Sequence, residues 1–297
     1  SDERYWLGHV RRMHPAHSVY VATHDSAITV GHDFGKLDAD TVARVCKHGC
    51  SICNSAYMQR HHRGGPSARP AKELPMGVMD QFGPVSVPSI YHGFVYANST
   101  VEARSGFIVT SGSKGASEQV LEEAANEFRA EMRPWVGEIA TLRTDMMRQT
   151  SISHRWQRYK NSEEPFISEN ATGMKHNPIG LIEIVHKSAW PRVMAALAHA
   201  RRGLEWWYIC WRYAIHMTNT DATRRDGTRT SRWVSLFGVP YNQQYDRVIL
   251  SPCQYYIDKE ARHKSDYKMK NALWCGFSPF NKQAAWLWQG DQFITVD

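Results

Sequence analysis

The first 62 residues differ from the rest of the chain in their content of metal-binding side chains. They hold eight of the 15 histidines and three of the six cysteines. His9 and His14 lie about one helical turn apart, and Cys50 and Cys53 form a Cys-x2-Cys knuckle that presents two thiolates. Two imidazoles and two thiolates complete the tetrahedron that structural zinc prefers. The sequence therefore predicts a zinc-binding helical domain over 1–62.

The ligand set of this predicted zinc site has alternatives within the same segment. Other side chains could substitute, namely His17, His24, His32, His48 and Cys46. A redox role for Cys50 and Cys53 is disfavoured, because no thioredoxin-like βαβ pattern surrounds them. The stretch that follows is rich in Gly, Pro and Arg, and we interpret 63–76 as a linker.

The composition describes a globular chain. Its 297 residues are 42% hydrophobic and 22% charged, and its 20 Gly and 13 Pro follow no period. This excludes collagen-like and low-complexity classes, and no run of 18 apolar residues predicts a membrane span. Six cysteines are too sparse for a disulfide scaffold at this length. The opening Ser-Asp-Glu-Arg has neither Met nor an apolar leader, which suggests an excised fragment or a product of polyprotein processing.

Strand and helix patterns alternate beyond the linker, which predicts an α/β core over 77–220. Short apolar runs predict strands at 78–87, 91–97, 106–110, 138–143 and 166–168. Helical spacing predicts helices at 116–132, 151–160, 181–200 and 204–217. We expect Ser113 to cap the first helix, Pro134 to lie just past its end, and Pro191 to kink or interrupt the third.

The C-terminal part, 221–297, is predicted to be a small β-rich, barrel-like module that follows a basic loop. The loop covers 221–232, and strands are predicted at 248–257, 272–277, 285–288 and 293–296. Short strands at close spacing are typical of small sheets and barrels.

Three carboxylates stand in or beside apolar runs, where a charged side chain is awkward to place. Asp80 lies in a predicted strand, Asp145 at a strand end, and Glu183 at the start of a helix. Such a set could hold two divalent cations about 4 Å apart for phosphoryl transfer. Each carboxylate taken alone is also compatible with a surface group or a helix cap.

The charge balance favours a polyanionic partner such as nucleic acid. Thirty-six Lys and Arg stand against 29 Asp and Glu, which gives a net charge of +7 and a pI near 9.1. A solvated basic face is the alternative interpretation of each basic residue. The candidate phosphate contacts are Arg63, Arg143, Lys187, Arg224, Arg225, Arg229, Arg232 and Lys264.

Several short motifs occur along the chain in a fixed order. They are His9-Val-Arg-Arg-Met-His14-Pro15, Cys50-Ser-Ile-Cys53, Asp80-Gln-Phe-Gly83-Pro84, Leu142-Arg143-Thr144-Asp145, Glu183 after 37 intervening positions, Leu236-Phe237-Gly238 and Leu273-Trp274-Cys275-Gly276-Phe277-Ser278. In this order, the chain resembles the integrase of copia-type LTR retrotransposons. The resemblance covers most of the chain.

The resemblance implies a fold, an activity and a set of partners. It implies a ribonuclease H-like core over 77–220, in which a mixed sheet brings Asp80, Asp145 and Glu183 together as ligands of two Mg²⁺ or Mn²⁺ ions. The implied reaction has two steps, in which water trims the 3′ end of element DNA and the new 3′ hydroxyl attacks target DNA. The implied partners are double-stranded DNA and further copies of the chain. The implied compartment is the nucleus or cytoplasm.

The sequence departs from the family pattern beside two of the three carboxylates. Asp145 is followed by Met146 to Thr150, without the two glycines that would let the backbone approach DNA or metal. The flanks of Glu183 also differ from the family motif. These departures keep open a second hypothesis, a decayed or domesticated integrase-derived protein that binds nucleic acid or supports assembly. A third hypothesis, an unrelated zinc-containing hydrolase, requires the motif order to be accidental.

Overall fold

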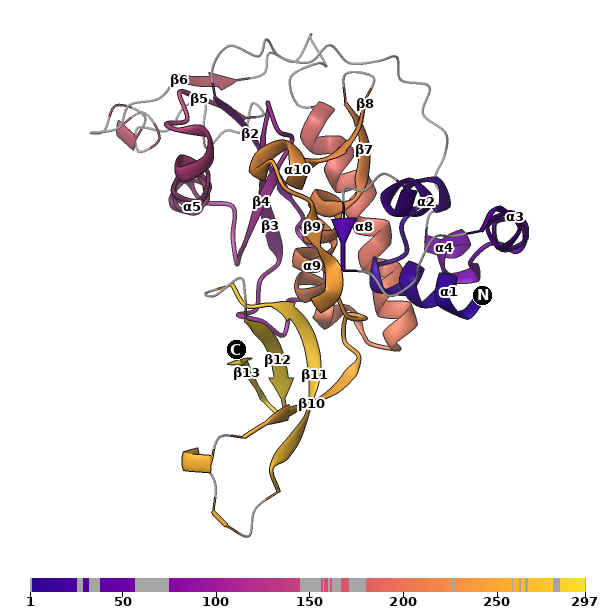
Figure 1. Cartoon of the computed structure of the whole chain (residues 1–297). Coiled ribbons are helices and arrows are strands. Elements are labelled where there is room, and N and C mark those ends of the chain that lie inside the picture. Colours follow the sequence, from indigo (N-terminus) through magenta and orange to yellow (C-terminus); the bar gives the residue numbers. More distant parts are fainter. Residues whose placement is uncertain are drawn as a thin grey trace.

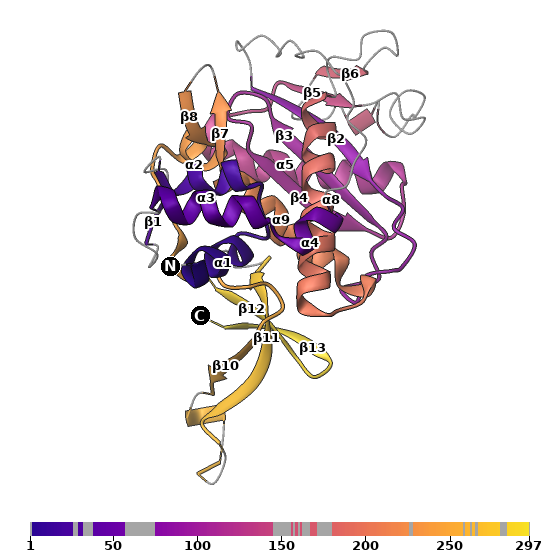
Figure 2. The same cartoon turned by 90° about the vertical axis from the view of Figure 1, so that its right-hand side faces the viewer.

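A computed structural model shows the fold of the chain (Figure 1). It describes residues 2–25, 29–31, 38–56, 75–144, 156, 158–159, 161, 167–170, 180–225, 228–257, 259–261, 263–264, 267–279 and 284–296. Within this part, helices at the N-terminus lie beside a central sheet with helices on both faces, and a small sheet lies below it (Figures 1 and 2). No helix in these ranges is both long and apolar enough to cross a membrane.

The N-terminal segment folds into short helices around a very small apolar cluster. Its elements are α1 (Asp2–Arg11), α2 (His17–Asp25), β1 (Thr29–Val30), α3 (Ala39–His48) and α4 (Ser51–Ala56). The buried cluster consists of Tyr5, Tyr20 and Val45, with Trp6 and Val42 packed against it. So small a cluster contributes little hydrophobic stabilisation, so these helices need further support.

The central sheet has five strands in the order β4-β3-β2-β5-β6. Its strands are β2 (Met76–Phe82), β3 (Tyr96–Glu102), β4 (Ile108–Ser113), β5 (Thr141–Thr144) and β6 (Ile167–Asn170). β2 pairs antiparallel with β3 and parallel with β5. The sheet is therefore mixed, and the predicted α/β architecture of this region is confirmed.

Helices cover both faces of this sheet because alternate residues of each strand point to opposite sides. α5 (Glu118–Val136) packs on one face through a cluster that includes Met79 and Phe128. α8 (Gly180–Ala200) and α9 (Trp207–Thr220) pack on the other face, in a larger cluster that includes Val78. Figures 1 and 2 show this arrangement. Gly77 permits close packing under α5, since a Cβ there would lie 2.6 Å from Phe128 Cε1.

The structure corrects several predicted boundaries in the core. β2 ends at Phe82, before Pro84, and β3 begins only at Tyr96. α5 is capped by Ser117, whose Oγ accepts a hydrogen bond from Val120 N at 3.4 Å, whereas the predicted cap Ser113 ends β4. Pro134 lies inside the last turn of α5 rather than past its end. A proline near a helix end removes one backbone hydrogen bond and leaves the preceding turns intact.

Of the two predicted effects of Pro191, a kink or an interruption, the structure excludes the interruption. α8 runs continuously from Gly180 to Ala200 with Pro191 inside. Buried residues on both sides of the proline, among them Val185, Ala189 and Val193, belong to the main apolar cluster. Their burial offsets the missing backbone hydrogen bond. After α8, the 3-10 helix η1 (Leu204–Trp206) leads into α9. Together η1 and α9 cover the helix predicted at 204–217 and extend it to Thr220.

The predicted basic loop at 221–232 is instead a β-hairpin. Its strands are β7 (Ala222–Arg225) and β8 (Thr228–Ser231), which lead into α10 (Arg232–Phe237). β9 (Tyr241–Asn242) then pairs in parallel with β1. Alternation of Thr with Arg stabilises paired strands, because β-branched side chains suit them.

The C-terminal strands form a second, antiparallel sheet in the order β10-β11-β12-β13. They are β10 (Pro252–Tyr256), β11 (Met269–Phe277), β12 (Ala285–Gln289) and β13 (Gln292–Val296), and two 3-10 helices, η2 (Gln243–Tyr245) and η3 (Lys259–Ala261), lie in the connections. The predicted strands are confirmed in place. The strand order is open, with β10 and β13 at its edges, whereas a barrel-like module was predicted.

Buried charges join the N-terminal helices to the rest of the molecule. Arg12, only 2% exposed, contacts Asp221 Oδ1 at the end of α9 and Asp246 Oδ2, the latter at 3.2 Å. Arg192 on α8 reaches the other oxygen of Asp221 at 2.7 Å. Tyr241 donates a hydrogen bond to Asp246 at 2.6 Å. This group, the Arg12 cluster, thus links α1, α8, α9 and the region after β9.

Candidate functional site

The structure brings the four predicted zinc ligands together. One donor atom from each of His9, His14, Cys50 and Cys53 lies within 4.8 Å of every other. His9 Nε2 is 3.2 Å from Cys53 Sγ, and His14 Nδ1 is 3.5 Å from Cys50 Sγ and 3.6 Å from Cys53 Sγ. Bonds of about 2.1 Å to nitrogen and 2.3 Å to sulfur in a tetrahedron put N and S about 3.6 Å apart. The donor set and its spacing therefore fit zinc.

A turn rather than a shared helix face brings the two histidines together. α1 ends at Arg11, and Met13 and His14 have positive φ angles of 55° and 54°. The chain folds back so that His14 N donates a hydrogen bond to His9 O at 2.9 Å. The predicted pairing of His9 and His14 is thus reached by a geometry that spacing alone did not indicate.

Electrostatics within the cluster favour the thiolate form of Cys50 and the protonated form of Cys53. The hydrogen bond from Cys53 is the largest cause that lowers the pKa of the Cys50 thiol, and His14 and His9 lower it further, whereas the pKa of Cys53 is raised. Burial lowers the pKa of His9, which keeps its imidazole neutral. A thiolate and neutral imidazoles are the forms that bind zinc.

Side chains around the cluster orient its histidines and tie it to the core. The ring of His17 stacks on His9 with centroids 5.2 Å apart, and the Tyr5 hydroxyl hydrogen bonds to His17 Nδ1. His199, in the last turn of α8, lies 5.5 Å from His14 between ring centroids. His17, one of the alternative ligands, therefore packs against the cluster and is not a member of it. His32 and the side chains of Cys46 and His48 lie outside the described residues.

Asp80 stands in the middle of β2, next to the helix that carries Glu183. Its carboxylate Oδ1 accepts a hydrogen bond from Gln81 N at 2.8 Å, and its side chain is 19% exposed. β5 ends at Thr144, which pairs with Met79, one residue before Asp80. Asp145 itself lies outside the described residues. The structure thus relates Asp80 to α8, while its relation to Asp145 is a prediction from sequence.

Glu183 lies in the first turn of α8 with an exposed side chain. Lys187, one turn later, donates a hydrogen bond to Glu183 Oε2 at 3.2 Å. The side chain of α8 that meets Asp80 is instead His186, whose Nδ1 lies 3.5 Å from Asp80 Oδ2. Burial lowers the pKa of His186 to about 4, so the imidazole is neutral at pH 7.

Sequence reasoning missed His186. Its signal was present as Glu183-x-x-His186, because residues three apart on a helix lie on adjacent turns and share a side. In this Glu-x-x-His pattern, only Glu183 was considered as a site residue from the sequence.

The basic residues predicted to contact phosphates lie in several places. Lys187 pairs with Glu183, Arg143 is half-buried on β5, and Arg229 is exposed on β8. Arg232 Nη1 donates to Thr218 O at 2.9 Å and so holds the end of α9. Exposed Lys264 lies in the connection between η3 and β11, in a different part of the chain from the β7–β8 hairpin. The described residues therefore do not form one continuous patch.

Two further basic predictions cannot be placed. Arg63 lies outside the described residues. Arg224 and Arg225 belong to β7, but their side chains are outside what the structure describes.

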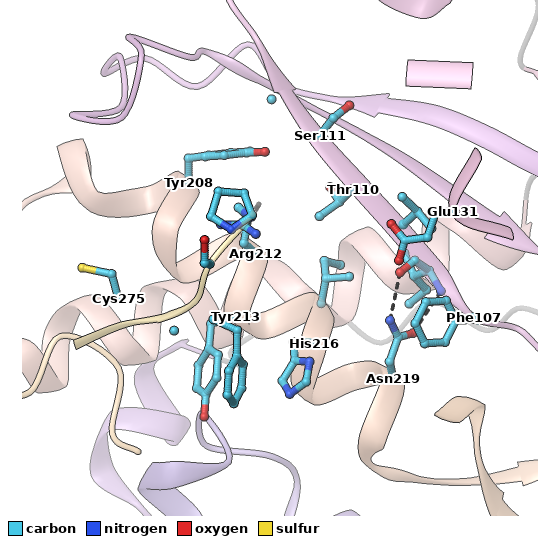
Figure 3. A pocket seen from close by; sticks show the side chains of 18 of the residues that line it. Phe107, Thr110, Ser111, Glu131, Tyr208, Arg212, Tyr213, His216, Asn219 and Cys275 are labelled. Carbon is cyan, nitrogen blue, oxygen red and sulfur yellow. Dashed lines mark hydrogen bonds between the residues drawn. The ribbon is translucent and has the colours of Figure 1, made fainter. Parts of the chain in front are cut away.

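A cavity of about 890 Å³ lies along β4, the edge strand of the central sheet (Figure 3). Residues of α5, α9 and β11 also line it, and many are aromatic. Asn219 lines the cavity and joins α9 to β4, since its Nδ2 donates to Ile108 O at 2.9 Å and its Oδ1 accepts from Ile108 N at 3.0 Å. Neither Asp80 nor Glu183 lines this cavity, so it is separate from the predicted carboxylate site.

Replacing Asn219 should destabilise the edge of the sheet. Asn219→Ala leaves the backbone N–H and C=O of Ile108 without these partners. Each buried polar group that loses its hydrogen-bond partner costs about 1–3 kcal/mol of stability. Urea unfolding should show this loss, whereas Asn271→Ala, at an exposed position, should change the free energy of unfolding by less than about 0.5 kcal/mol. Equal stability of the two variants would contradict the bridging role of Asn219.

No family model matches the chain, and no curated protein matches it. Among solved structures, it is similar to a chain of the simian T-cell lymphotropic virus intasome in complex with PP2A regulatory subunit B56 gamma, with 11% identity, a TM-score of 0.41, and coverage of 77% of this chain and 81% of that chain. It is also similar to the catalytic core domain of BIV integrase, with 12% identity, a TM-score of 0.41, and coverage of 56% of this chain and 95% of that chain. A third similar structure is the HTLV-2 integrase catalytic core domain in complex with magnesium, in dimeric form. Its identity is 16%, its TM-score is 0.40, and the match covers 54% of this chain and 95% of that chain. Likenesses of this extent do not by themselves decide fold family or function.

Proposed function

We propose that the chain is a copia-type integrase, a polynucleotidyl transferase that trims the 3′ ends of element DNA and joins them to target DNA. The motif order supports this proposal, and so does a mixed sheet flanked by helices. In the proposal the core is ribonuclease H-like, 1–62 is a zinc-binding domain, and 221–297 is a C-terminal module. The chain acts on double-stranded DNA as a homo-oligomer.

The observation that carries the proposal is the position of Asp80 against α8. Asp80 lies at the centre of the sheet, beside the parallel strand β5, and it faces the first turns of the helix that begins with Glu183. These are the places where the family resemblance requires its acidic ligands. Asp80, Asp145 and Glu183 would hold the divalent cations, which supply charge neutralisation and activation of the attacking oxygen when bound.

The protein's own residues in this proposal position the DNA and the cations. Carboxylates would bind cations rather than attack the phosphorus, and the basic candidates would bind the DNA backbone. Since backbone contacts release counterions, binding should weaken steeply as salt rises. Arg229 and Lys264, both exposed, are two of the described candidates for contacts with phosphates.

A strand-transfer assay tests the proposal. With Mn²⁺ and a labelled duplex that ends in CA, we expect joined product from the wild type. Glu183→Gln and Asp145→Asn should lower the yield at least about 100-fold, since even residues that only orient a ligand cost 10–100-fold. Glu123→Gln is a matched control, because it makes the same chemical change at an exposed position of α5 and should leave the yield unchanged.

The non-catalytic alternative predicts a different outcome of the same assay. Glu183 is exposed and engaged by Lys187, and the sequence beside Asp145 departs from the family pattern. If no variant and no wild type yields product, while zinc is bound and duplex DNA is retained at low salt, the chain is a DNA-binding or assembly protein. In that case the addition of Mn²⁺ should raise the Tm of the wild type by no more than it raises the Tm of Asp145→Asn.

A further inference from the structure

The side chain that meets Asp80 across the sheet–helix interface is an imidazole. His186 belongs to the second turn of α8, is 9% exposed, and directs Nδ1 toward Asp80 Oδ2 at 3.5 Å. Glu183, three residues earlier on α8, is close enough to act electrostatically on the same imidazole. The imidazole of His186 therefore meets one carboxylate where β2 meets α8, and Glu183 lies one turn away on the same helix.

Aromatic side chains pack against this imidazole and contribute to its burial. The Phe82 ring lies 5.6 Å from His186 and the Trp211 ring also lies 5.6 Å from it, between centroids. Among the residues that the structure describes, His186 Nε2 has no hydrogen-bond partner. Nδ1, which faces Asp80, is therefore the His186 nitrogen that a cation held by this carboxylate could reach.

The distance between His186 and Asp80 suits two ligands of one cation better than a hydrogen bond. N–H···O hydrogen bonds are usually 2.7–3.2 Å long, and 3.5 Å is beyond that range. Two donors that bind one ion through bonds of about 2.1 Å lie about 3.0–3.4 Å apart at angles between 90° and 109°. Only a small adjustment would bring His186 Nδ1 and Asp80 Oδ2 onto one ion.

A nitrogen in the ligand set changes which metals the site prefers. Oxygen ligands alone suit Mg²⁺, whereas imidazole favours transition ions. We propose that His186 Nδ1 is a ligand of the cation bound by Asp80 and Glu183, and that this site prefers Mn²⁺ to Mg²⁺. This inference rests on the proposed function for the identity of the carboxylate site, and adds to it a ligand and a metal preference.

Electron paramagnetic resonance of bound Mn²⁺ tests the inference directly. The full chain is first loaded with Zn²⁺, so that His9 and His14 are occupied by zinc. These two imidazoles then cannot bind Mn²⁺ and contribute no ¹⁴N signal. Mn²⁺ held by an imidazole gives ¹⁴N modulation of its spin echo. We expect this modulation in the wild type, together with tighter binding of Mn²⁺ than of Mg²⁺ in competition titrations.

The variant His186→Asn separates ligation from positioning. Its amide nitrogen can still donate a hydrogen bond to Asp80, but it is a poor metal ligand. We expect loss of the ¹⁴N modulation and at least about a tenfold rise in the Kd for Mn²⁺, with little change in the Kd for Mg²⁺. His92→Asn is the matched control, because His92 is exposed and its φ of 55° suits Asn.

The possible failures are distinguishable. Mn²⁺ bound without ¹⁴N modulation in the wild type overturns the role of His186 and leaves the carboxylate site and the proposed function standing. Equal Mn²⁺ spectra in wild type and His186→Asn, with strand transfer lost in the variant, would show that His186 only positions Asp80. If Asp80→Asn does not weaken Mn²⁺ binding to the zinc-loaded chain, the carboxylate site fails, and the inference fails with it.

Discussion

Cys50→Ser should abolish zinc binding and unfold the N-terminal helices. Zinc stabilises small modules of this kind by roughly 10–16 kcal/mol, which exceeds what the apolar cluster of Tyr5, Tyr20 and Val45 can supply. We therefore expect the metal content to fall from one zinc per chain to none. Helical circular dichroism should decrease, and amide hydrogens of α1, α3 and α4 should exchange rapidly.

The matched control for this prediction is Cys253→Ser. Cys253 is half-buried in β10, where its Sγ contacts Ala272 O at 3.5 Å, and it is not part of the zinc cluster. This variant should keep its zinc and its exchange protection in α1–α4. If Cys50→Ser lost zinc but kept protected helices, the metal would not be needed for folding of this segment.

The four members of the His2Cys2 cluster were predictable from sequence, because metal-binding chemistry depends on residue type and short spacing. His-x4-His and Cys-x2-Cys name the four ligands, and the structure gathers those four. The turn at Met13 and His14 was not predictable, because positive φ angles in these residues arise from the packing around them. The C-terminal strands were also found in place, since alternating apolar residues signal strands directly.

The core site was less predictable because it depends on contacts between distant segments. Glu183 was found from its place in a motif, yet the residue of α8 that meets Asp80 is His186. Only the rotation of α8 against β2 decides which side chain faces the sheet, and spacing along one helix does not contain that information. Similarly, an interruption at Pro191 was one of two predicted outcomes because the burial of α8 on both sides of the proline was unknown.

Arg12 shows the same limit for charged residues. In sequence it belongs to a short basic stretch between His9 and His14, and such a stretch is compatible with a solvated face. In the structure it is buried, and its partners Asp221 and Asp246 are more than 200 residues away along the chain. Long-range ion pairs leave no local pattern, so only the fold reveals them.

Arg12→Met should lower the free energy of unfolding by about 3–5 kcal/mol, because it leaves a buried carboxylate uncompensated. Asp221 would retain Arg192, but Asp246 would lose its cation. Burial already raises the pKa of Asp246 to about 6, so this carboxylate is ionised at pH 7 while Arg12 is present. Chemical unfolding at pH 7 measures the loss.

The exposed pair between Arg44 and Asp2 provides the control for Arg12. Arg44 Nη2 lies 2.6 Å from Asp2 Oδ1, and both side chains are about half exposed, so Arg44→Met should cost less than about 1 kcal/mol. Adding Asp246→Asn to Arg12→Met should recover part of the lost stability, because it removes the orphaned charge. Equal costs for Arg12→Met and Arg44→Met would contradict the linking role of the Arg12 cluster.

Combining Arg12→Met with Cys50→Ser tests whether the zinc site and the Arg12 cluster act as one unit. Arg12 lies between the end of α1 and His14, so the turn that places His14 in the His2Cys2 cluster also holds Arg12 against Asp221. Loss of zinc should free this turn, after which Arg12 contributes little. The two substitutions together should therefore cost less than the sum of their separate costs, whereas a strictly additive result would show that zinc binding and the docking of the N-terminal helices on the core are independent.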